Sequence, residues 1–483
     1  MRVDESNTGP ELLLSVRRGE GAPPLGVQIE QGLRSAIRER RINRGERLPP
    51  TRTLAGDLGV SRRVVVSAFD QLVAEGWLDA RVGAGTYVRL ALPEPRAAGA
   101  VPGLPDQPRR GIRASPTVRF DFFPGHPDLG AFPRAAWTRA TRDALREISD
   151  AALGYSDPRG LRELRVAVAG MLARTRGVVC RPRQVVICQG AAQALGLLVQ
   201  AATATTRRPP RIAVEDPCLP EHRDLLTFHG ADLVPVPVDE LGVRDEAIVA
   251  ARCDHALLTP AHQCPTGVVL SAGRRPAIVR WAQGGNVLLI EDDYDAEYRY
   301  NRAPVAALQA LAPDSVAYLG SASKTLAPAL RLAWLVVPED RLEAVVQAKR
   351  YADGGSPAID QAVFARLIAS GSYDRHLRTA RRRQSERRDA LVAAVARHLP
   401  QSRVEGAAAG LHAVVRLPAP VDADDIRVRA LTRGVSVYPM SAWHADPPPE
   451  TSRIVLGYGS LAPPAIAEGV RRLSEVVAQS CAS

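Results

Sequence analysis

Lysine is almost absent from this sequence. Lys and Arg together number 63, but only two of these residues, Lys324 and Lys349, are lysines. Either residue type can supply a surface charge, whereas only a primary amine condenses with an aldehyde to form a Schiff base. The two lysines are therefore the first positions to examine for covalent chemistry.

Long apolar runs are also missing. No stretch approaches the roughly 18 apolar residues of a membrane span. The polar, acidic N-terminus lacks the apolar core of a signal peptide. We therefore expect a cytoplasmic protein with no membrane partner. The six cysteines contain no Cys-x-x-Cys pair, which predicts reduced, mostly buried thiols and no metal site.

The remaining composition is that of an ordinary globular protein. The 483 residues are 46% hydrophobic and 24% charged, and the chain is long enough for two or three domains. The formal net charge of +11 permits a nucleic-acid partner without requiring one.

Residues 1–88 have the pattern of a winged helix-turn-helix, mostly helical with a β-wing. Apolar residues at helical spacing over 26–42 are followed by a short helix at 51–58 and a third helix to residue 75, with Ser61 as its N-cap. Short apolar alternation around a Gly-x-Gly turn then predicts a hairpin over 76–88. A purely structural helical cap is the alternative interpretation.

The literal residues of this region resemble the GntR-type DNA-binding domain. The matching segments are Leu48–Ala55, Leu58–Arg62, Glu75–Leu78 and Gly83–Thr86. The resemblance implies that the third helix enters the major groove of double-stranded operator DNA and that the wing touches the backbone or the minor groove. Arginine suits phosphates and guanine edges, although each arginine here could also be plain surface charge. The implied DNA-binding residues are Arg52, Ser61, Arg62, Arg63, Gly83, Gly85 and Thr86.

Beyond this region the chain changes character twice. Residues 89–118 are proline-rich without apolar periodicity, which predicts a semi-rigid linker. From 119 to 483, strand-like apolar runs alternate with helical segments, which predicts an α/β domain with a mostly parallel sheet. The expected strands lie at 185–188, 211–215, 256–258, 287–290, 316–319 and 333–337.

Lys324 follows one of these strands. The apolar run 316–319 ends at Gly320-Ser321, and the loop carries Lys324 from the strand end, where parallel sheets hold their ligands. A solvated surface lysine is the alternative. Lys349 stands in an arginine-flanked helical stretch, and we expect it to be a charged helix face.

Polar residues follow other strands too. Gln189-Gly190-Ala191-Ala192 is typical of a glycine turn that opens a helix and can hold a phosphate on its backbone N–H groups. The run 291–295 places four carboxylates and Tyr294 after another strand. One of these acids could pair with a pyridine nitrogen, and the alternatives are an acidic surface loop or a metal site. Arg331 could neutralise a phosphate. An amine, an acid and a phosphate-binding turn together are typical of a site for pyridoxal 5′-phosphate (PLP).

At this point the large region resembles a fold-type I aminotransferase, and the whole chain, from about residue 25 to 480, resembles the MocR subfamily of GntR regulators. The matching segments include Gly154–Gly160, Glu215–Pro217, His262–Gly267 and Ser323–Arg331.

The resemblance implies a role for each matching residue. Lys324 forms the internal aldimine, and Asp292 pairs with the pyridinium nitrogen, with Asp293 as a nearby competitor. Tyr294 reaches the ring hydroxyl, and Arg453 clamps the carboxylate of an amino acid. The implied phosphate ligands are Ser321, Arg331, Gly190, Ala191, Ala192 and, from the partner subunit of a homodimer, Tyr155. Ser323 is implied as a further cofactor-binding residue.

Three residues depart from the family pattern. Leu219 stands where an aromatic ring stacks on the cofactor, Cys264 where aminotransferases have Asn, and Ala191 where a serine is expected. The lost stacking and hydroxyl would lower cofactor affinity by about 1–3 kcal/mol.

The expected function is transcription regulation. The protein would bind operator DNA and respond to PLP, an amine or an amino acid through an aldimine at Lys324. A working aminotransferase with an appended DNA-binding domain is the alternative, so the sequence leaves enzymatic turnover open. A third possibility is a regulator whose large domain has lost the cofactor.

Overall fold

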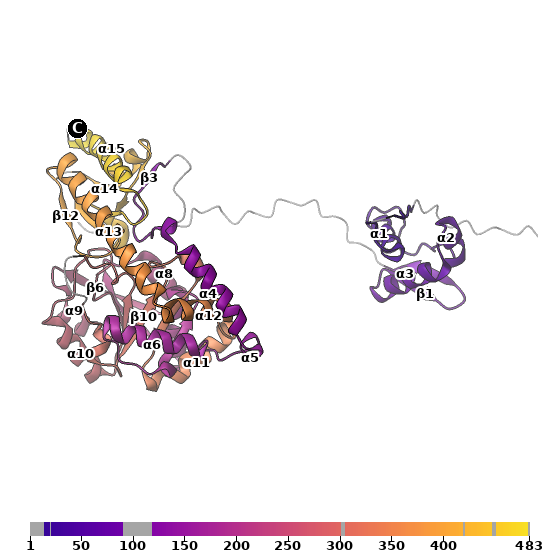
Figure 1. Ribbon diagram of the computed structural model, residues 1–483, viewed down its shortest axis with the longest axis horizontal. Coiled ribbons are helices and arrows are strands. Elements are labelled where there is room, and N and C mark those ends of the chain that lie inside the picture. The colour runs from indigo at the N-terminus through magenta and orange to yellow at the C-terminus, as the bar shows by residue number, and fades with distance from the viewer. Residues whose placement is uncertain are drawn as a thin grey trace, which may run out of the picture. The chain divides into compact units, whose positions relative to one another are not determined.

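The chain divides into two compact units, one within residues 1–109 and one within 110–483. The computed structural model describes residues 14–19, 21–89, 118–300, 305–418, 421–446 and 451–481 (Figure 1). Nearly all of the predicted linker, residues 90–117, lies outside the described residues.

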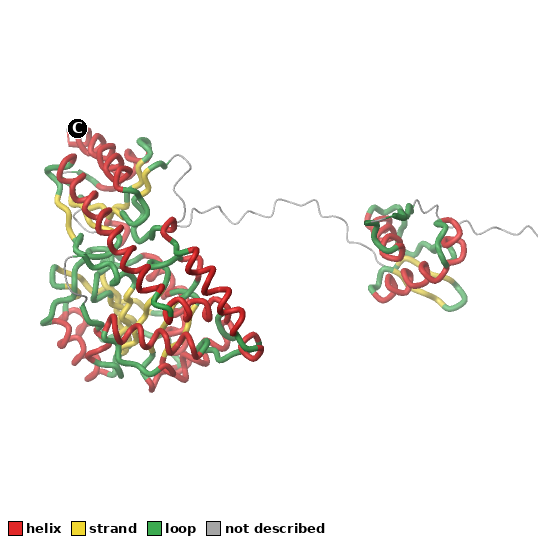
Figure 2. The backbone as a smooth tube through the Cα atoms, in the orientation of Figure 1, coloured by secondary structure: helices red, strands yellow, loops and turns green. Residues whose placement is uncertain are grey.

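The first unit is the predicted winged helix-turn-helix (Figure 2). Its helices bury one apolar stripe each, with Ile29, Leu33, Phe69 and Leu72 almost inaccessible to solvent. The two strands pair antiparallel as the wing. The elements are α1 (Leu25–Arg38), α2 (Thr51–Asp57), α3 (Arg62–Ala74), β1 (Leu78–Arg81) and β2 (Gly85–Val88).

An eight-stranded sheet organises the second unit. Its order is β4-β11-β10-β9-β8-β5-β6-β7, and the five central strands from β10 to β6 are parallel. All six predicted strands are present. The strands are β4 (Val185–Cys188), β5 (Arg211–Asp216), β6 (Asp232–Asp239), β7 (Gly242–Val243), β8 (His255–Leu258), β9 (Leu288–Asp293), β10 (Val316–Ser321) and β11 (Ala333–Val336).

Strand β6 was not predicted. Pro235 and Pro237 interrupt its apolar run, and proline argues against a strand because it lacks the N–H that a ladder needs. The strand forms nevertheless, since all its residues from Asp232 to Pro237 pair with β5 on one side.

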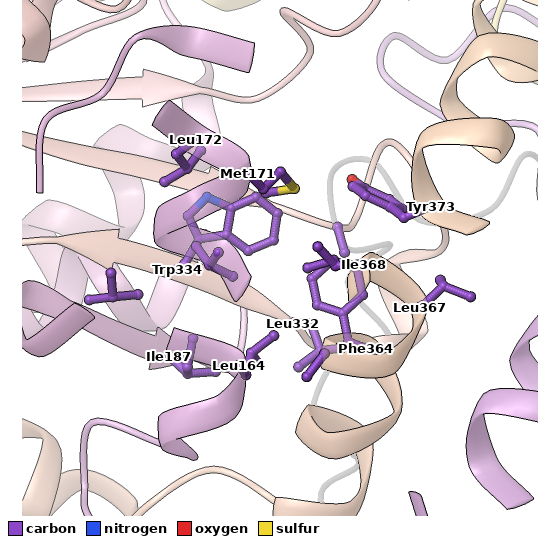
Figure 3. Close-up of a cluster of buried hydrophobic side chains, with 14 of the residues drawn as sticks. Leu164, Met171, Leu172, Ile187, Leu332, Trp334, Phe364, Leu367, Ile368 and Tyr373 are labelled. Carbon is purple, nitrogen blue, oxygen red and sulfur yellow. The ribbon is translucent and has the colours of Figure 1, made fainter. Parts of the chain in front are cut away.

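Helices cover both faces of this sheet because its strands are apolar on both sides. One face packs against α6, α10 and α12, and the other packs against α7, α8 and α11. Figure 3 shows the first face, where Trp334 of β11 stacks on Phe364 of α12 with ring centroids 5.9 Å apart. The helices are α4 (Arg134–Glu147), α5 (Asp150–Leu153), α6 (Arg162–Arg176), α7 (Ala191–Thr206), α8 (Pro220–Phe228), α9 (Asp245–Ala250), α10 (Arg274–Gly285), α11 (Glu339–Asp353) and α12 (Ala358–Ala369).

A smaller lobe completes the second unit. Four antiparallel strands in the order β12-β13-β16-β15 pack on α13, α14 and α15, and the long helix α13 extends from the large sheet into this lobe (Figure 1). Strand β3 (Phe120–Asp121) pairs with β14 (Val435–Ser436) beside them. The other elements are β12 (Arg403–Glu405), β13 (His412–Arg416), β15 (Tyr438–Pro439), β16 (Arg453–Gly457), α13 (Ser372–His398), α14 (Ala423–Leu431) and α15 (Pro463–Cys481).

No helix in the described part of the chain is long and apolar enough to cross a membrane. The six cysteines are free thiols. Two are buried, three are half-buried and Cys481 is exposed, so the prediction that most of them are buried is only partly right.

Candidate functional site

A cavity of about 280 Å³ opens where β5, β8, β9 and β10 end. The ends of parallel strands are the expected place for a ligand in such a sheet. The structure brings most of the predicted cofactor residues to this one cavity. Those in its wall are Ala191, Ala192, Asp292, Tyr294, Ser321, Ser323, Lys324 and Arg331.

Lys324 is half-buried in the cavity wall and is not a surface lysine. Its backbone carbonyl accepts a hydrogen bond of 3.0 Å from the hydroxyl of Tyr298. Gly125 packs so closely that a Cβ there would lie 3.1 Å from Nζ of Lys324. Burial lowers the pKa of Lys324, because it disfavours the charged ammonium. A neutral primary amine is the form that attacks an aldehyde.

Of the two neighbouring acids, Asp292 faces the cavity and Asp293 does not. Successive side chains of β9 point to opposite faces, and Asp293 accepts hydrogen bonds of 2.6 Å each from Nε of Arg176 and from the hydroxyl of Tyr318. Burial raises the pKa of Asp292 to about 7, and the charge of Asp293 adds to the effect. Asp292 is thus the acid of this pair that a ligand in the cavity can reach.

Tyr294 is held by a buried histidine. Its hydroxyl lies 3.0 Å from Nδ1 of His262, which is also 3.1 Å from the carboxylate of Asp295. Burial opposes protonation of His262, but the Asp295 carboxylate raises its pKa overall. This pairing explains part of the acidic run 291–295. Within the described ranges no group of three or more His, Cys, Asp or Glu residues is arranged to hold a metal ion.

The other end of the cavity is built for an anion. Gly190 has a φ of 100° and immediately precedes the first residue of α7, whose first N–H groups have no partner within the helix. Arg331 donates to the carbonyl of Gln189, and a Cβ at Gly190 would lie 2.6 Å from its guanidinium. A guanidinium beside a helix N-terminus is an arrangement that can bind an anion such as a phosphate.

Lys349 corrects a prediction, because it is fully buried and is not a charged helix face. Its Nζ lies 2.5 Å from Oδ2 of Asp353, which also accepts hydrogen bonds from the side chains of Gln189 and Gln193. Through Asp353, the second lysine therefore stabilises the turn that contains Gly190.

Several cavity residues were not predicted from sequence. Glu215 lies in the matching segment Glu215–Pro217, but the resemblance implied no role for it. His222 lies with its Nδ1 3.8 Å from Oδ2 of Asp292. His412 of β13 and Trp443 of the 3-10 turn Met440–Trp443 come from the small lobe. Burial lowers the pKa values of His222 and His412 to about 4. The two small-lobe residues have no local sequence signal, because only the tertiary fold brings them near Lys324.

Two predicted residues lie elsewhere. Tyr155 is fully exposed in the single chain and is not part of the cavity wall. Arg453 begins β16 and lies 3.6 Å from Glu405, and it is likewise absent from the cavity wall.

The predicted DNA-binding residues gather around α3 and the wing. Ser61 is the N-cap residue of α3, but its side chain makes no capping hydrogen bond. Gly85 lies against the guanidinium of Arg47, which sequence reasoning did not single out. The exposed residues of the predicted set are Arg52, Ser61, Arg62, Arg63 and Gly83, whereas Gly85 and Thr86 are half-buried.

Comparisons with known proteins agree with both units. Residues 25–88 match the bacterial regulatory proteins of the gntR family, and residues 126–463 match aminotransferase class I and II. The probable rhizopine catabolism regulatory protein MocR of Rhizobium meliloti is 32% identical, over 93% of this chain and 93% of its own. The pyridoxine biosynthesis transcriptional regulator PdxR of Corynebacterium glutamicum is 32% identical, over 90% of this chain and 92% of its own.

Among solved structures, the α-aminoadipate aminotransferase LysN of Thermus thermophilus, complexed with N-(5′-phosphopyridoxyl)-L-leucine, superposes with a TM-score of 0.68 at 28% identity, over 77% of this chain and 97% of that one. A multiple substrate aminotransferase of Thermococcus profundus superposes with a TM-score of 0.70 at 24% identity, over 76% and 93%. The chain therefore belongs to the MocR subfamily of GntR transcription regulators, in which a DNA-binding winged helix-turn-helix is joined to a fold-type I aminotransferase domain.

Proposed function

We propose that this chain is a PLP-dependent regulator that binds operator DNA and responds to PLP or to an amine or amino acid at Lys324. The observation that carries the proposal is the meeting of a half-buried amine, a buried acid and an arginine beside a helix N-terminus in one cavity. Lys324, Asp292 and Arg331 all line it. The aminotransferase class I and II fold is in general a PLP-dependent fold.

The residues fit the cofactor at each of its three functional ends. Arg331 and the first N–H groups of α7 would hold the phosphate, with Ser321 and Ser323 beside them. Asp292 would meet the ring nitrogen and Tyr294 the ring hydroxyl. When bound, PLP would supply an aldehyde that condenses with primary amines, and Nζ of Lys324 is the amine that would hold it until another amine takes its place. Leu219 keeps one wall apolar but does not provide aromatic stacking.

Operator binding would use the exposed surface of the first unit. Arg52, Arg62 and Arg63 are exposed on and beside α3, where they can reach phosphates and base edges. Gly83, Gly85 and Thr86 belong to the wing and its turn. A homodimer would present two such units to two half-sites, and binding to chromosomal DNA places the protein in the cytoplasm.

An effector would act by shifting the balance between two DNA-bound arrangements of the dimer. The small lobe contributes His412 and Trp443 to the cavity, so a ligand there contacts both lobes of the second unit. A ligand that binds one arrangement of the lobes more tightly favours that arrangement. The exposed Tyr155 would complete the phosphate site of the partner subunit.

The test is a pair of variants at Lys324. Lys324→Ala removes the amine, and Lys324→Arg keeps a cation that cannot condense with an aldehyde. Both should lose the visible absorption of covalently bound cofactor and the effect of amines on operator binding, measured by fluorescence anisotropy, while binding DNA as the wild type does. An amine response that persists unchanged in both variants would refute the mechanism.

A working aminotransferase is the second candidate. The 2-aminoadipate transaminase of Thermus thermophilus is 30% identical over 74% of this chain, and the cavity of this protein holds both an amine and an acid. Steady conversion of an amino acid with a keto-acid acceptor would support this candidate. Effector binding without turnover would exclude it.

A further inference from the structure

The cavity has one wall that the cofactor proposal does not use. Trp443 belongs to a buried apolar cluster with Val414, Met440 and Val455 of the small lobe, and Leu219 and Cys264 pack against that cluster. Trp443, Leu219 and Cys264 also line the cavity, so the apolar cluster continues to its surface. We call this surface the Trp443 wall.

The Trp443 wall is held in place by hydrogen bonds to the large lobe. The carbonyl of Trp443 accepts from the backbone N–H of Cys218 at 3.0 Å and from Nη1 of Arg223 at 2.5 Å. The other terminal nitrogen of Arg223 donates to the carbonyl of His444 at 3.0 Å. The wall is therefore a built surface joining both lobes.

His412 also lines the cavity, and one hydrogen bond fixes which of its ring nitrogens carries the proton. Its Nε2 lies 3.0 Å from the carbonyl oxygen of Pro265, and a carbonyl can only accept, so Nε2 carries the proton. The other nitrogen, Nδ1, is then left with a lone pair. A lone pair accepts from an N–H group and repels a carboxylate.

Within the described part of this chain, no third lysine or arginine lines the cavity to meet a carboxylate. Lys324 and Arg331 are the two cationic residues among the described residues that line the cavity, and both have roles in holding the cofactor. Arg453 pairs with Arg416, four residues along β13 from His412, which is about 13 Å away along the strand. The apolar pair Val414 and Val455 lies between them.

Arg453 also has an acidic neighbour of its own. Its guanidinium lies 3.6 Å from Glu405, which also pairs with Arg416 at 3.3 Å. An effector carboxylate at the Trp443 wall would lose its hydration without gaining a cationic partner, which is costly.

We propose that the effector of this regulator is a primary monoamine with an apolar or aromatic body and no carboxylate, seated on the Trp443 wall near His412. The inference rests on the proposed function, since the amine acts at the cofactor held by Lys324. It narrows the effector from amines and amino acids in general to amines alone.

The test uses the full-length, PLP-loaded protein and two pairs of ligands that differ only by a carboxylate: 2-phenylethylamine against L-phenylalanine, and pentylamine against L-norleucine. The change in visible absorption is followed during titration. Each amine should reach half-saturation at a concentration at least ten-fold lower than its amino acid. Equal or tighter binding of the amino acids overturns the inference, and so does a coloured protein that responds to none of the four. A protein that takes up no colour refutes the proposed function and the inference with it.

Variants locate the preference on the wall. Trp443→Ala should raise the half-saturating concentration of 2-phenylethylamine at least ten-fold and leave the cofactor colour unchanged, whereas Trp443→Leu should keep most of the affinity. Phe228→Ala, which removes an exposed aromatic ring at the end of α8, is the control and should change nothing. Thermal unfolding of each variant confirms folding. If Trp443→Ala folds and binds the amine as the wild type does, the wall is not the effector site.

Discussion

Nε of Arg176 lies 2.6 Å from Oδ2 of Asp293, and both side chains are almost completely buried. The pair occupies the face of the large sheet that packs against α6, opposite the face from which Asp292 enters the cavity. Because Arg176 and Tyr318 engage Asp293, the two adjacent acids are kept in separate roles.

Removing Arg176 should destabilise the protein strongly. Arg176→Met leaves the carboxylate of Asp293 buried without its cation, and losing one partner of a buried pair costs about 3–5 kcal/mol. Urea unfolding followed by circular dichroism measures the loss. Arg174→Ala on the same helix removes an exposed arginine paired with Asp374, and it should cost less than about 1 kcal/mol. Similar losses in the two variants would contradict this role for the buried pair.

Asp292 should make the cofactor-free protein less stable as the pH rises. Burial raises its pKa from 3.8 to about 7, so between these values the folded state holds a proton that the unfolded state has lost. Stability from this group is complete below pH 4 and is lost as the pH rises toward 7. The free energy of unfolding of Asp292→Asn should therefore fall less steeply with pH than that of the wild type between pH 5 and 7. The expected difference in slope is about 1 kcal/mol per pH unit.

Unfolding midpoints at several pH values, compared between the two proteins, check this prediction. Only the difference is informative, because His222 and His412 have pKa values lowered to about 4 and push the slope the other way between pH 4 and 6.5. Parallel curves for wild type and Asp292→Asn would show that Asp292 does not titrate in this way.

Gly190 should be required for phosphate binding. A Cβ at this position would lie 2.6 Å from the guanidinium of Arg331, so Gly190→Ala displaces the arginine in addition to straining a φ of 100°. We expect PLP affinity, measured by absorbance titration, to fall at least ten-fold. Gly230→Ala is a matched control, since its φ is 89° and nothing lies within 4 Å of the new Cβ. Equal effects of the two variants on PLP affinity would mean that the Arg331 contact is unimportant.

Arg62 should contribute a phosphate or base contact in the operator complex. Arg62→Ala should weaken operator binding and reduce the slope of log K against log salt by about 1. Anisotropy titrations over a range of salt concentrations measure both quantities. Arg397→Ala changes the net charge equally at an exposed position in the last turn of α13, and it should alter neither. An unchanged salt slope in Arg62→Ala would remove this residue from the DNA contact.

Sequence patterns were most reliable where physics is local. The three helices and the wing follow from apolar periodicity and glycine turns, and the six predicted strands follow from short apolar runs. Strand β6 escaped prediction because its stability comes from pairing with β5 and outweighs the effect of its prolines. Lys349 was misjudged because a helical, arginine-flanked context does not reveal a partner such as Asp353 four residues later in a buried setting.

The sequence alone determined which chemistry was available, because a scarce primary amine, an acidic run and a glycine turn each followed a recognisable strand. The sequence also determined the family, through motifs such as Ser323–Arg331. Only the tertiary structure decided that Asp292, and not Asp293, faces the amine, and that His412 and Trp443 of the small lobe close the cavity. The physical reason is that strand-end residues are set by local alternation, whereas a wall built from two lobes depends on contacts between segments hundreds of residues apart.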